Sequence, residues 1–91
     1  MYYVYVLISH ADNRFYVGFT NNLNMRLNSH ARGQVESTRN RRPLELVYCE
    51  GCLERNDALR REKYLKTTWG KRYLRNRIGT YMKTEWGYLT G

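Results

Sequence analysis

Residues 2–20 read Tyr-Tyr-Val-Tyr-Val-Leu-Ile-Ser-His-Ala-Asp-Asn-Arg-Phe-Tyr-Val-Gly-Phe-Thr. The segments 2–9 and 15–20 are dense in aromatic and β-branched side chains, which are typical of strands. Residues 10–13 lie between them and consist of turn formers. The stretch therefore predicts a β-hairpin, and the rest of the chain has to cover the two faces of that hairpin.

Side chains alternate between the faces of a strand, so the two faces of the hairpin can be assigned from the sequence. One face of the first strand carries Val4, Val6 and Ile8, and the matching face of the second strand carries Phe15, Val17 and Phe19. If these two apolar sets line the core, Tyr5 and Tyr16 emerge together on the opposite face. Taken alone, such tyrosines are more often packing partners across strands than functional groups.

The segments after the hairpin predict three helices and one further strand. We expect a helix from an N-cap at Thr20 to about Ala31, followed by a strand, a second helix starting at Asn56 or Asp57, and a third helix. The expected bounds of the last three are Leu44–Glu50, about Asp57–Thr68 and about Lys71–Ile78. Residues 33–42 lack apolar periodicity and predict an exposed loop.

This order of elements, β-β-α-β-α-α, predicts an α+β fold with a three-stranded antiparallel sheet flanked by helices. With 91 residues, the chain is expected to form one domain over 1–91, with a core at about 2–78. The tail 79–91 contains Tyr81, Trp86 and Tyr88 without a clear period, so it is expected to be irregular or docked as a terminal segment.

The chain is strongly basic, with 16 Lys+Arg against 8 Asp+Glu and a formal net charge of +8. Such an excess points to a polyanionic partner, either nucleic acid or an anionic membrane. No apolar run approaches the roughly 20 residues of a membrane span, and the first residues do not follow the order of a signal peptide. A cytoplasmic protein is therefore expected.

Three polar residues fall at positions that ordinary packing does not require. Arg26 and His30 are four residues apart on the first predicted helix and so stack along one edge of it. Glu62 lies three residues from both Leu59 and Leu65 and falls inside the apolar arc of its helix. A carboxylate directed at the core needs a cation, which is either a metal ion or a neighbouring basic side chain.

Two tripeptides and four single residues together resemble the GIY-YIG nuclease superfamily. The first tripeptide is Tyr3-Val4-Tyr5 and the second is Tyr16-Val17-Gly18, with their tyrosines eleven residues apart. Arg26 and His30 follow at the separations that this family shows, Glu62 matches its acidic residue, and Asn76 matches a downstream asparagine of several members. The sequence departs from the pattern at Tyr3 and Val4, where the family's first motif has glycine and isoleucine.

The resemblance covers about residues 2–78 and is to the small stand-alone bacterial members. It implies a metal-dependent endonuclease that hydrolyses DNA phosphodiester bonds, with catalytic residues Tyr5, Tyr16, Arg26, His30, Glu62 and Asn76. It also implies one divalent ion, Mg²⁺ or Mn²⁺, held by Glu62. DNA repair is among the functions of this superfamily, so branched and damaged DNA are candidate substrates.

The chemistry of phosphodiester hydrolysis fits these residue types. The carboxylate of Glu62 is a hard oxygen ligand, and one carboxylate suffices for Mg²⁺ when waters and the substrate phosphate supply the other ligands. Arg26 offers a planar fork of donors to phosphate oxygens. Either Tyr5, if nearby cations lower its pKa, or His30 could take the proton of the attacking water. The sequence leaves both schemes open.

Further basic residues are expected to position DNA through its phosphates. They lie in the loop and on the second and third predicted helices: Arg39, Arg41, Arg42, Arg60, Arg61, Lys63, Lys66, Lys71, Arg72, Arg75 and Arg77. Contacts with phosphates carry little sequence information, and no second domain is expected that could read bases. Low sequence specificity is therefore predicted.

Four alternatives stay open at this point. The protein could be a nucleic-acid-binding module with the same fold and little or no catalytic activity. Glu62 could pair with Arg26 or with Lys66, and Asn76 could serve only as a helix-end hydrogen-bonding group. Cys49 and Cys52 could form a redox pair or half of a zinc site, although ordinary reduced thiols are favoured because no second cysteine pair exists. The oligomeric state, monomer or homodimer, is open as well.

Overall fold

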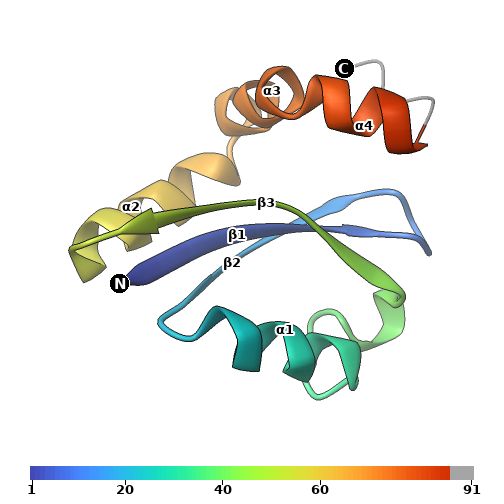
Figure 1. Ribbon diagram of the computed structural model, residues 1–91, viewed down its shortest axis with the longest axis horizontal. Helices are drawn as coiled ribbons and strands as arrows, with labels where there is room; N and C mark the ends of the chain where they lie inside the picture. Colours follow the sequence, from blue (N-terminus) through green and yellow to red (C-terminus); the bar gives the residue numbers. More distant parts are fainter. Residues whose placement is uncertain (87–91) are drawn as a thin grey trace.

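The computed structural model describes residues 1–86. Figure 1 shows a three-stranded sheet with helices on both faces. The elements in chain order are β1 (Tyr2–Ser9), β2 (Phe15–Thr20), α1 (Leu23–Ala31), the 3₁₀-helix η1 (Arg39–Arg41), β3 (Leu44–Cys52), α2 (Arg55–Leu65), α3 (Thr68–Arg77) and α4 (Gly79–Trp86). The predicted α+β class and the predicted order β-β-α-β-α-α of strands and α-helices are confirmed, with η1 and α4 as additional elements. None of the helices in this described part is long and apolar enough to cross a membrane.

The sheet is antiparallel and has the strand order β2-β1-β3, so β1 is its central strand. β1 buries both of its faces from Val4 to Ser9. Helix α1 covers one face, and α2, α3 and α4 lie over the other (Figure 1). The two faces that the sequence assigns to the hairpin are therefore both covered, each by a different group of helices.

The apolar face of the hairpin forms the main core. Val4, Val6 and Val17 pack with side chains from the helices on that face, namely Ala58, Leu65 and Leu74. Each buried valine or leucine side chain of this core contributes about 1.5–3 kcal/mol by leaving water. The predicted alternation is thus confirmed, and Tyr5 and Tyr16 lie on the α1 face.

Several predicted helix and strand ends are wrong by two or three residues. α1 begins at Leu23 because the side chain of Asn22 caps it by accepting from the Met25 amide, while Thr20 bonds with Asn22 instead. α2 ends at Leu65 rather than Thr68, because Thr67 accepts from the Gly70 amide and starts α3 at Thr68. The third strand runs two residues further than predicted, to Cys52.

Of the two alternatives expected for the tail, the docked terminal segment is present over residues 79–86, which form α4, and the irregular one is wrong there. Met82 is fully buried and packs with Ile8 and Ile78 in a second, smaller core. A single buried side chain among residues 79–85, whose burial the structure describes, produces no periodicity that a sequence can reveal. Tyr88, the last aromatic residue of the tail, lies outside the described residues.

The segment 33–42 is only partly the exposed loop that its composition predicts. Two of its residues, Val35 and Thr38, are buried, and the end of the segment forms η1. Gly33 adopts a φ of +74°, and the Arg42 guanidinium lies where a side chain at position 33 would be. This segment therefore folds back under α1 and brings Thr38 toward the site described next.

Candidate active site

Two strands place the tyrosines of the site. Tyr5 lies opposite Gly18 in the β1–β2 pair, and Gly18 leaves room for the Tyr5 ring because it has no side chain. Tyr16 pairs with Leu7 on the same face, and its ring centroid is 6.4 Å from that of Tyr5. Tyr5 is fully buried, whereas Tyr16 is half-buried. The second tripeptide thus supplies the half-buried Tyr16 and, at Gly18, the space that holds the Tyr5 ring.

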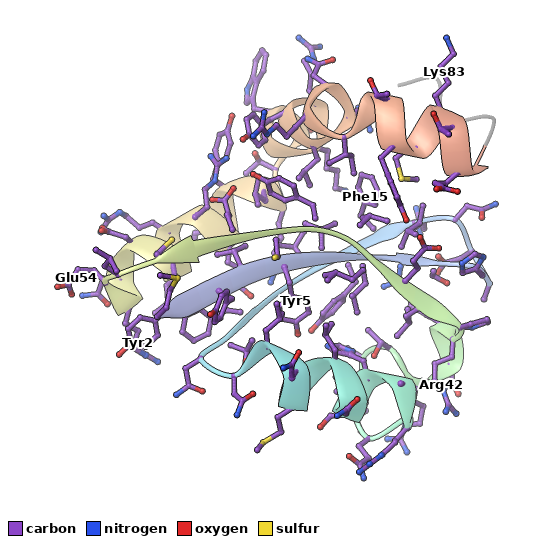
Figure 2. The ribbon with its side chains drawn as sticks, viewed as in Figure 1. Tyr2, Tyr5, Phe15, Arg42, Glu54 and Lys83 are labelled. Carbon is purple, nitrogen blue, oxygen red and sulfur yellow. The ribbon has the colours of Figure 1, made fainter. Side chains whose placement is uncertain are left out.

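Helix α1 brings Arg26 and His30 onto these rings. Figure 2 shows Tyr5 in the space between β1 and α1. The Tyr5 hydroxyl is 2.7 Å from His30 Nε2 and accepts a hydrogen bond of 3.3 Å from Arg26 Nε. The imidazole also packs edge-on against both tyrosine rings, at 5.5 Å from Tyr5 and 5.3 Å from Tyr16. The structure therefore brings together four of the six predicted catalytic residues.

Thr38 completes this polar chain. Its hydroxyl is fully buried and lies 2.7 Å from His30 Nδ1. Arg26 has no acceptor atom, so the hydrogen of the buried Tyr5 hydroxyl goes to His30 Nε2. A neutral imidazole then carries its proton on Nδ1, and this N–H donates a hydrogen bond to the Thr38 hydroxyl. The order of donation is Arg26 to Tyr5, Tyr5 to His30 and His30 to Thr38.

Burial controls the protonation of this cluster. It lowers the pKa of His30 from 6.5 to about 4, with a smaller contribution from the nearby Arg26 charge, so the imidazole is neutral at pH 7. Burial also raises the pKa of Tyr5, and it outweighs the opposing effect of the hydrogen bond from Arg26. Within the protein itself, the nearby Arg26 charge therefore does not bring the Tyr5 pKa below its ordinary value, because removing a phenolate from water costs more than Arg26 returns.

Glu62 has no hydrogen bond to Tyr5, Tyr16, Arg26 or His30 within the described part of the chain. Its side chain is 22% exposed and forms an ion pair of 3.3 Å with Lys66, one turn along α2. Its charge acts on Tyr5 through space and contributes to the raised pKa of that phenol. Of the two predicted ion-pair alternatives, the pairing with Lys66 is present.

The donor set around Glu62 suits one type of metal ion. Residues 1–86 contain no group of three or more His, Cys, Asp and Glu side chains that could enclose an ion. Zinc prefers four protein ligands or three protein ligands and a water, which this site does not offer. A single accessible carboxylate fits Mg²⁺ or Mn²⁺, which keep several waters when bound. Glu62 is the residue that would hold such an ion.

Asn76 lies apart from the cluster. It is exposed on α3, which covers the opposite face of the sheet from α1. Within the described part of the chain, no hydrogen bond connects it with Tyr5, Tyr16, Arg26 or His30.

The two cysteines do not form a pair. Cys49 is exposed, Cys52 is partly buried, and both are free thiols. They are three residues apart in β3, and side chains at that spacing point to opposite faces of a strand. This arrangement disfavours the redox-pair and zinc-site alternatives.

The basic residues expected to position DNA differ in how their charges are engaged. Arg61 pairs with Glu50 at 2.7 Å and stacks on the Tyr73 ring at 4.5 Å, which connects α2 with β3 and α3. Other members of the set pair with acids or contact carbonyls and rings: Arg39, Arg41, Arg42, Arg60, Lys66 and Arg72. The remaining four have neither an ion pair nor a side-chain contact of these kinds within residues 1–86: Lys63, Lys71, Arg75 and Arg77.

Sequence reasoning missed three contributors to the site. Thr38 and Ser37 lie in a polar segment without periodicity, and Ser37 donates to the Tyr16 hydroxyl at 3.5 Å. Nothing local distinguishes them from loop residues. Gly18 could have been found, because a glycine inside a strand often marks a close approach of another group.

Comparisons with known proteins identify the family of this chain. The model of the family described as the GIY-YIG catalytic domain matches residues 1–77. A UPF0213 protein of Limosilactobacillus reuteri is 44% identical over 68 residues, which cover 71% of this chain and 70% of that protein. A UPF0213 protein of Staphylococcus aureus is 36% identical over 75 residues, covering 81% and 90% of the two chains. The solution NMR structure of a UPF0213 protein from Bacillus halodurans superposes with a TM-score of 0.58 at 31% identity, covering 93% of this chain and 95% of that one.

Proposed function

Because the chain belongs to the GIY-YIG catalytic domain family, a family of nucleases, we propose that it is a metal-dependent endonuclease that hydrolyses DNA phosphodiester bonds with low sequence specificity. The observation that carries this proposal is the polar chain from Arg26 through Tyr5 to His30. It joins a phosphate-binding cation directly to a hydroxyl and a neutral imidazole that can accept a proton.

Arg26 is the group proposed to bind the scissile phosphate. Its guanidinium is half-buried and its hydrogen bond to Tyr5, at 3.3 Å, is long. A charge-assisted bond to a phosphate oxygen is stronger than this bond to a neutral hydroxyl. Arg26 is therefore expected to turn toward a bound phosphate, which uncovers the side of the Tyr5 oxygen that it occupies in the free protein.

Once uncovered, Tyr5 is proposed to work with His30 as a proton relay. The attacking water transfers a proton to the Tyr5 oxygen while the Tyr5 hydrogen passes to His30 Nε2, so a free phenolate never forms. This route fits the raised pKa of Tyr5 and the neutral state of His30. Tyr16, with its half-exposed hydroxyl, is proposed to orient the water or the phosphate.

The remaining roles concern the divalent ion, Glu62 and Asn76. A bound Mg²⁺ or Mn²⁺ would supply charge for the phosphate oxygens as the reaction proceeds. Glu62 is proposed to hold this ion after releasing Lys66. Asn76 stays a proposed participant on the basis of the family pattern alone.

The test is a cleavage assay with supercoiled, branched and single-stranded DNA in the presence of Mg²⁺ or Mn²⁺. We expect Tyr5→Phe, Arg26→Ala and Glu62→Gln each to lower the cleavage rate by about 10²-fold or more, with DNA still bound. Tyr2→Phe and Glu54→Gln are the matched controls, because both residues lie outside the cluster. Equal cleavage by the wild type and Glu62→Gln would point to a contaminating nuclease and would refute the proposal.

A nucleic-acid-binding module with little or no catalytic activity is the second candidate. Two observations favour it: Tyr5 is fully buried, and the Glu62 carboxylate is already paired with Lys66. Binding of all three DNA forms without cleavage of any of them would support this function over catalysis.

A further inference from the structure

A cavity of about 610 Å³ opens at the beginning of β2, at the end of the hairpin. Its lining comes from three places: the turn at Asp12 and Arg14 with the adjoining Phe15, Arg41 in η1, and Lys71 and Arg75 on α3. The volume lies within the usual range of ligand sites, which is about 300–1,000 Å³. The lining has four cationic side chains and one carboxylate, so it suits an anion.

Arg41 is held in a defined position at this cavity. Its Nε donates to Asp12 at 2.7 Å, and its Nη2 donates to the carbonyl oxygens of Arg14 and Phe15 at 3.1 and 3.5 Å. The same guanidinium lowers the pKa of Asp12 to about 2, so the carboxylate is ionised at neutral pH and offsets the charge of Arg41. The hairpin end is thereby fixed to η1.

The other three cations of the cavity are not offset in this way. Arg14, Lys71 and Arg75 have no ion pair within residues 1–86. Arg14 and Lys71 are exposed, and Arg75 is half-buried. An unpaired cation keeps its full charge for a ligand, whereas a paired one has to exchange its partner. The cavity therefore presents an excess of positive charge from two elements that are far apart in sequence.

The cavity and the tyrosine cluster meet at β2. Phe15 lines the cavity and points toward α3 and α4 in Figure 2, and the next residue, Tyr16, points to the α1 face. Because Phe15 and Tyr16 are consecutive residues, the cavity and the tyrosine cluster lie on opposite faces of the same end of β2. β2 is an edge strand with no further strand beside it in the described sheet. A polyanion lying along this edge can reach both sites.

We propose that the cavity at Arg14, Arg41, Lys71 and Arg75 binds a backbone phosphate of the nucleic acid that occupies the active site. This proposal rests on the proposed function, because it places a second phosphate next to the one bound by Arg26. Arg14, which no sequence pattern singled out, becomes a binding residue. The cavity sets the direction of the bound strand, since the strand has to extend from the cluster toward the hairpin end.

The test measures DNA affinity in the absence of divalent ions, so that cleavage plays no part. Fluorescein-labelled duplex and single-stranded oligonucleotides are titrated at several salt concentrations with the wild type, Arg14→Gln and the double variant Lys71→Gln/Arg75→Gln. The charge-matched control is Arg32→Gln/Lys83→Gln, which removes two exposed cations outside the cavity. Pyrophosphate is titrated against the same proteins by NMR as a probe for free phosphate compounds.

For duplex DNA we expect the slope of log affinity against log salt to fall by about 0.9 in the double variant, the value for one lost phosphate contact, and by at most this amount in Arg14→Gln. The control should change the slope much less. Equal effects of the two double variants would overturn the proposal, because the losses would then reflect net charge only. Pyrophosphate binding that depends on Lys71 and Arg75, with DNA affinity unchanged, would assign the cavity to a free phosphate compound and overturn the nucleic-acid proposal.

This design separates the two proposals. A wild type that binds DNA through the cavity but does not cleave it would refute the nuclease and leave the phosphate site standing. If the wild type cleaves DNA and the cavity variants lose no more DNA affinity than the control, the nuclease proposal stands and the phosphate site is refuted. No binding of any DNA form would refute both.

Discussion

Gly18 and Tyr5 lie opposite each other so closely that a Cβ atom at position 18 would be 2.4 Å from both Cζ and Oη of Tyr5. The Tyr5 ring therefore occupies the place of the missing side chain. Its hydroxyl reaches His30 and Arg26 from there. The glycine of the second tripeptide thus positions the tyrosine of the first.

Gly18→Ala is expected to destabilise the protein by about 1–3 kcal/mol, because an added methyl group in a filled site forces the ring to move. Urea unfolding measures this change, and the NMR signals of the His30 ring should shift with it. Gly79→Ala is the control, since a Cβ there meets nothing within 4 Å. It should be neutral or stabilising by up to about 1 kcal/mol. Equal stability of the two variants would contradict the close fit of Tyr5 against Gly18.

His30 should make stability depend on pH. Its pKa is about 4 in the folded protein against 6.5 ordinarily, so between these values the unfolded chain binds more protons. The free energy of unfolding is therefore expected to fall by up to about 3 kcal/mol as the pH drops from 6.5 to 4, and to be unaffected by this group above 6.5. His30→Gln should flatten the profile in this window, whereas His10→Gln should not.

Urea titrations at several pH values provide the measurement for His30. Asp12 acts in a separate window, because its depressed pKa of about 2 removes stability only below its ordinary value of 3.8. Parallel profiles of the wild type and His30→Gln between pH 4 and 6.5 would show that the imidazole is not buried in its neutral form.

The ion pair between Glu62 and Lys66 should compete with a divalent ion. Lys66→Gln frees the carboxylate and is expected to tighten Mn²⁺ binding by up to about fivefold, because a partly exposed pair contributes about 1 kcal/mol or less. Glu62→Gln should abolish the binding, and Lys83→Gln is the charge-matched control. Electron paramagnetic resonance gives the free Mn²⁺ concentration. Unchanged binding in Glu62→Gln would place the ion elsewhere.

Glu50 should contribute to stability rather than to catalysis. It accepts from Arg61 at 2.7 Å and from the Tyr48 hydroxyl at 2.6 Å, and both donors are partly buried. Glu50→Ala is expected to cost about 1–3 kcal/mol in urea unfolding, since it leaves both donors without this acceptor. Glu54→Ala, an exposed change nearby in the chain, should stay within about 0.5 kcal/mol. A similar loss of stability in both variants would show that the hydrogen bonds of Glu50 with Arg61 and Tyr48 do not stabilise the fold.

The strand faces were predictable because alternation is a local property of a strand. Val4, Val6 and Val17 lie in the core as predicted, and the tripeptides identified the family that the matched model confirms over residues 1–77. The spacing of Arg26 and His30 also predicted that they share one edge of α1, which the contacts with Tyr5 bear out.

The ends of elements were harder to predict because they depend on single hydrogen bonds. Thr20 and Asn22 are both good capping residues, and in the folded protein it is Asn22 that caps α1. The same holds for Thr67, whose side chain starts α3 where the sequence suggested a continuing helix. α4 was missed because its stability comes from Met82 packing against Ile8, more than 70 residues earlier.

Local pattern was enough to place residues on faces, to pair Tyr5 with Tyr16 and to pair Arg26 with His30, and the family resemblance joined the two pairs into one site. It was not enough to show that Tyr5 is fully buried, that Thr38 holds the imidazole, or that Arg14, Lys71 and Arg75 surround one cavity. Periodicity depends on neighbours a few residues away, and those neighbours are visible in a sequence. Desolvation and charge pairing depend on segments that meet only when the chain folds, and they set the protonation of this site.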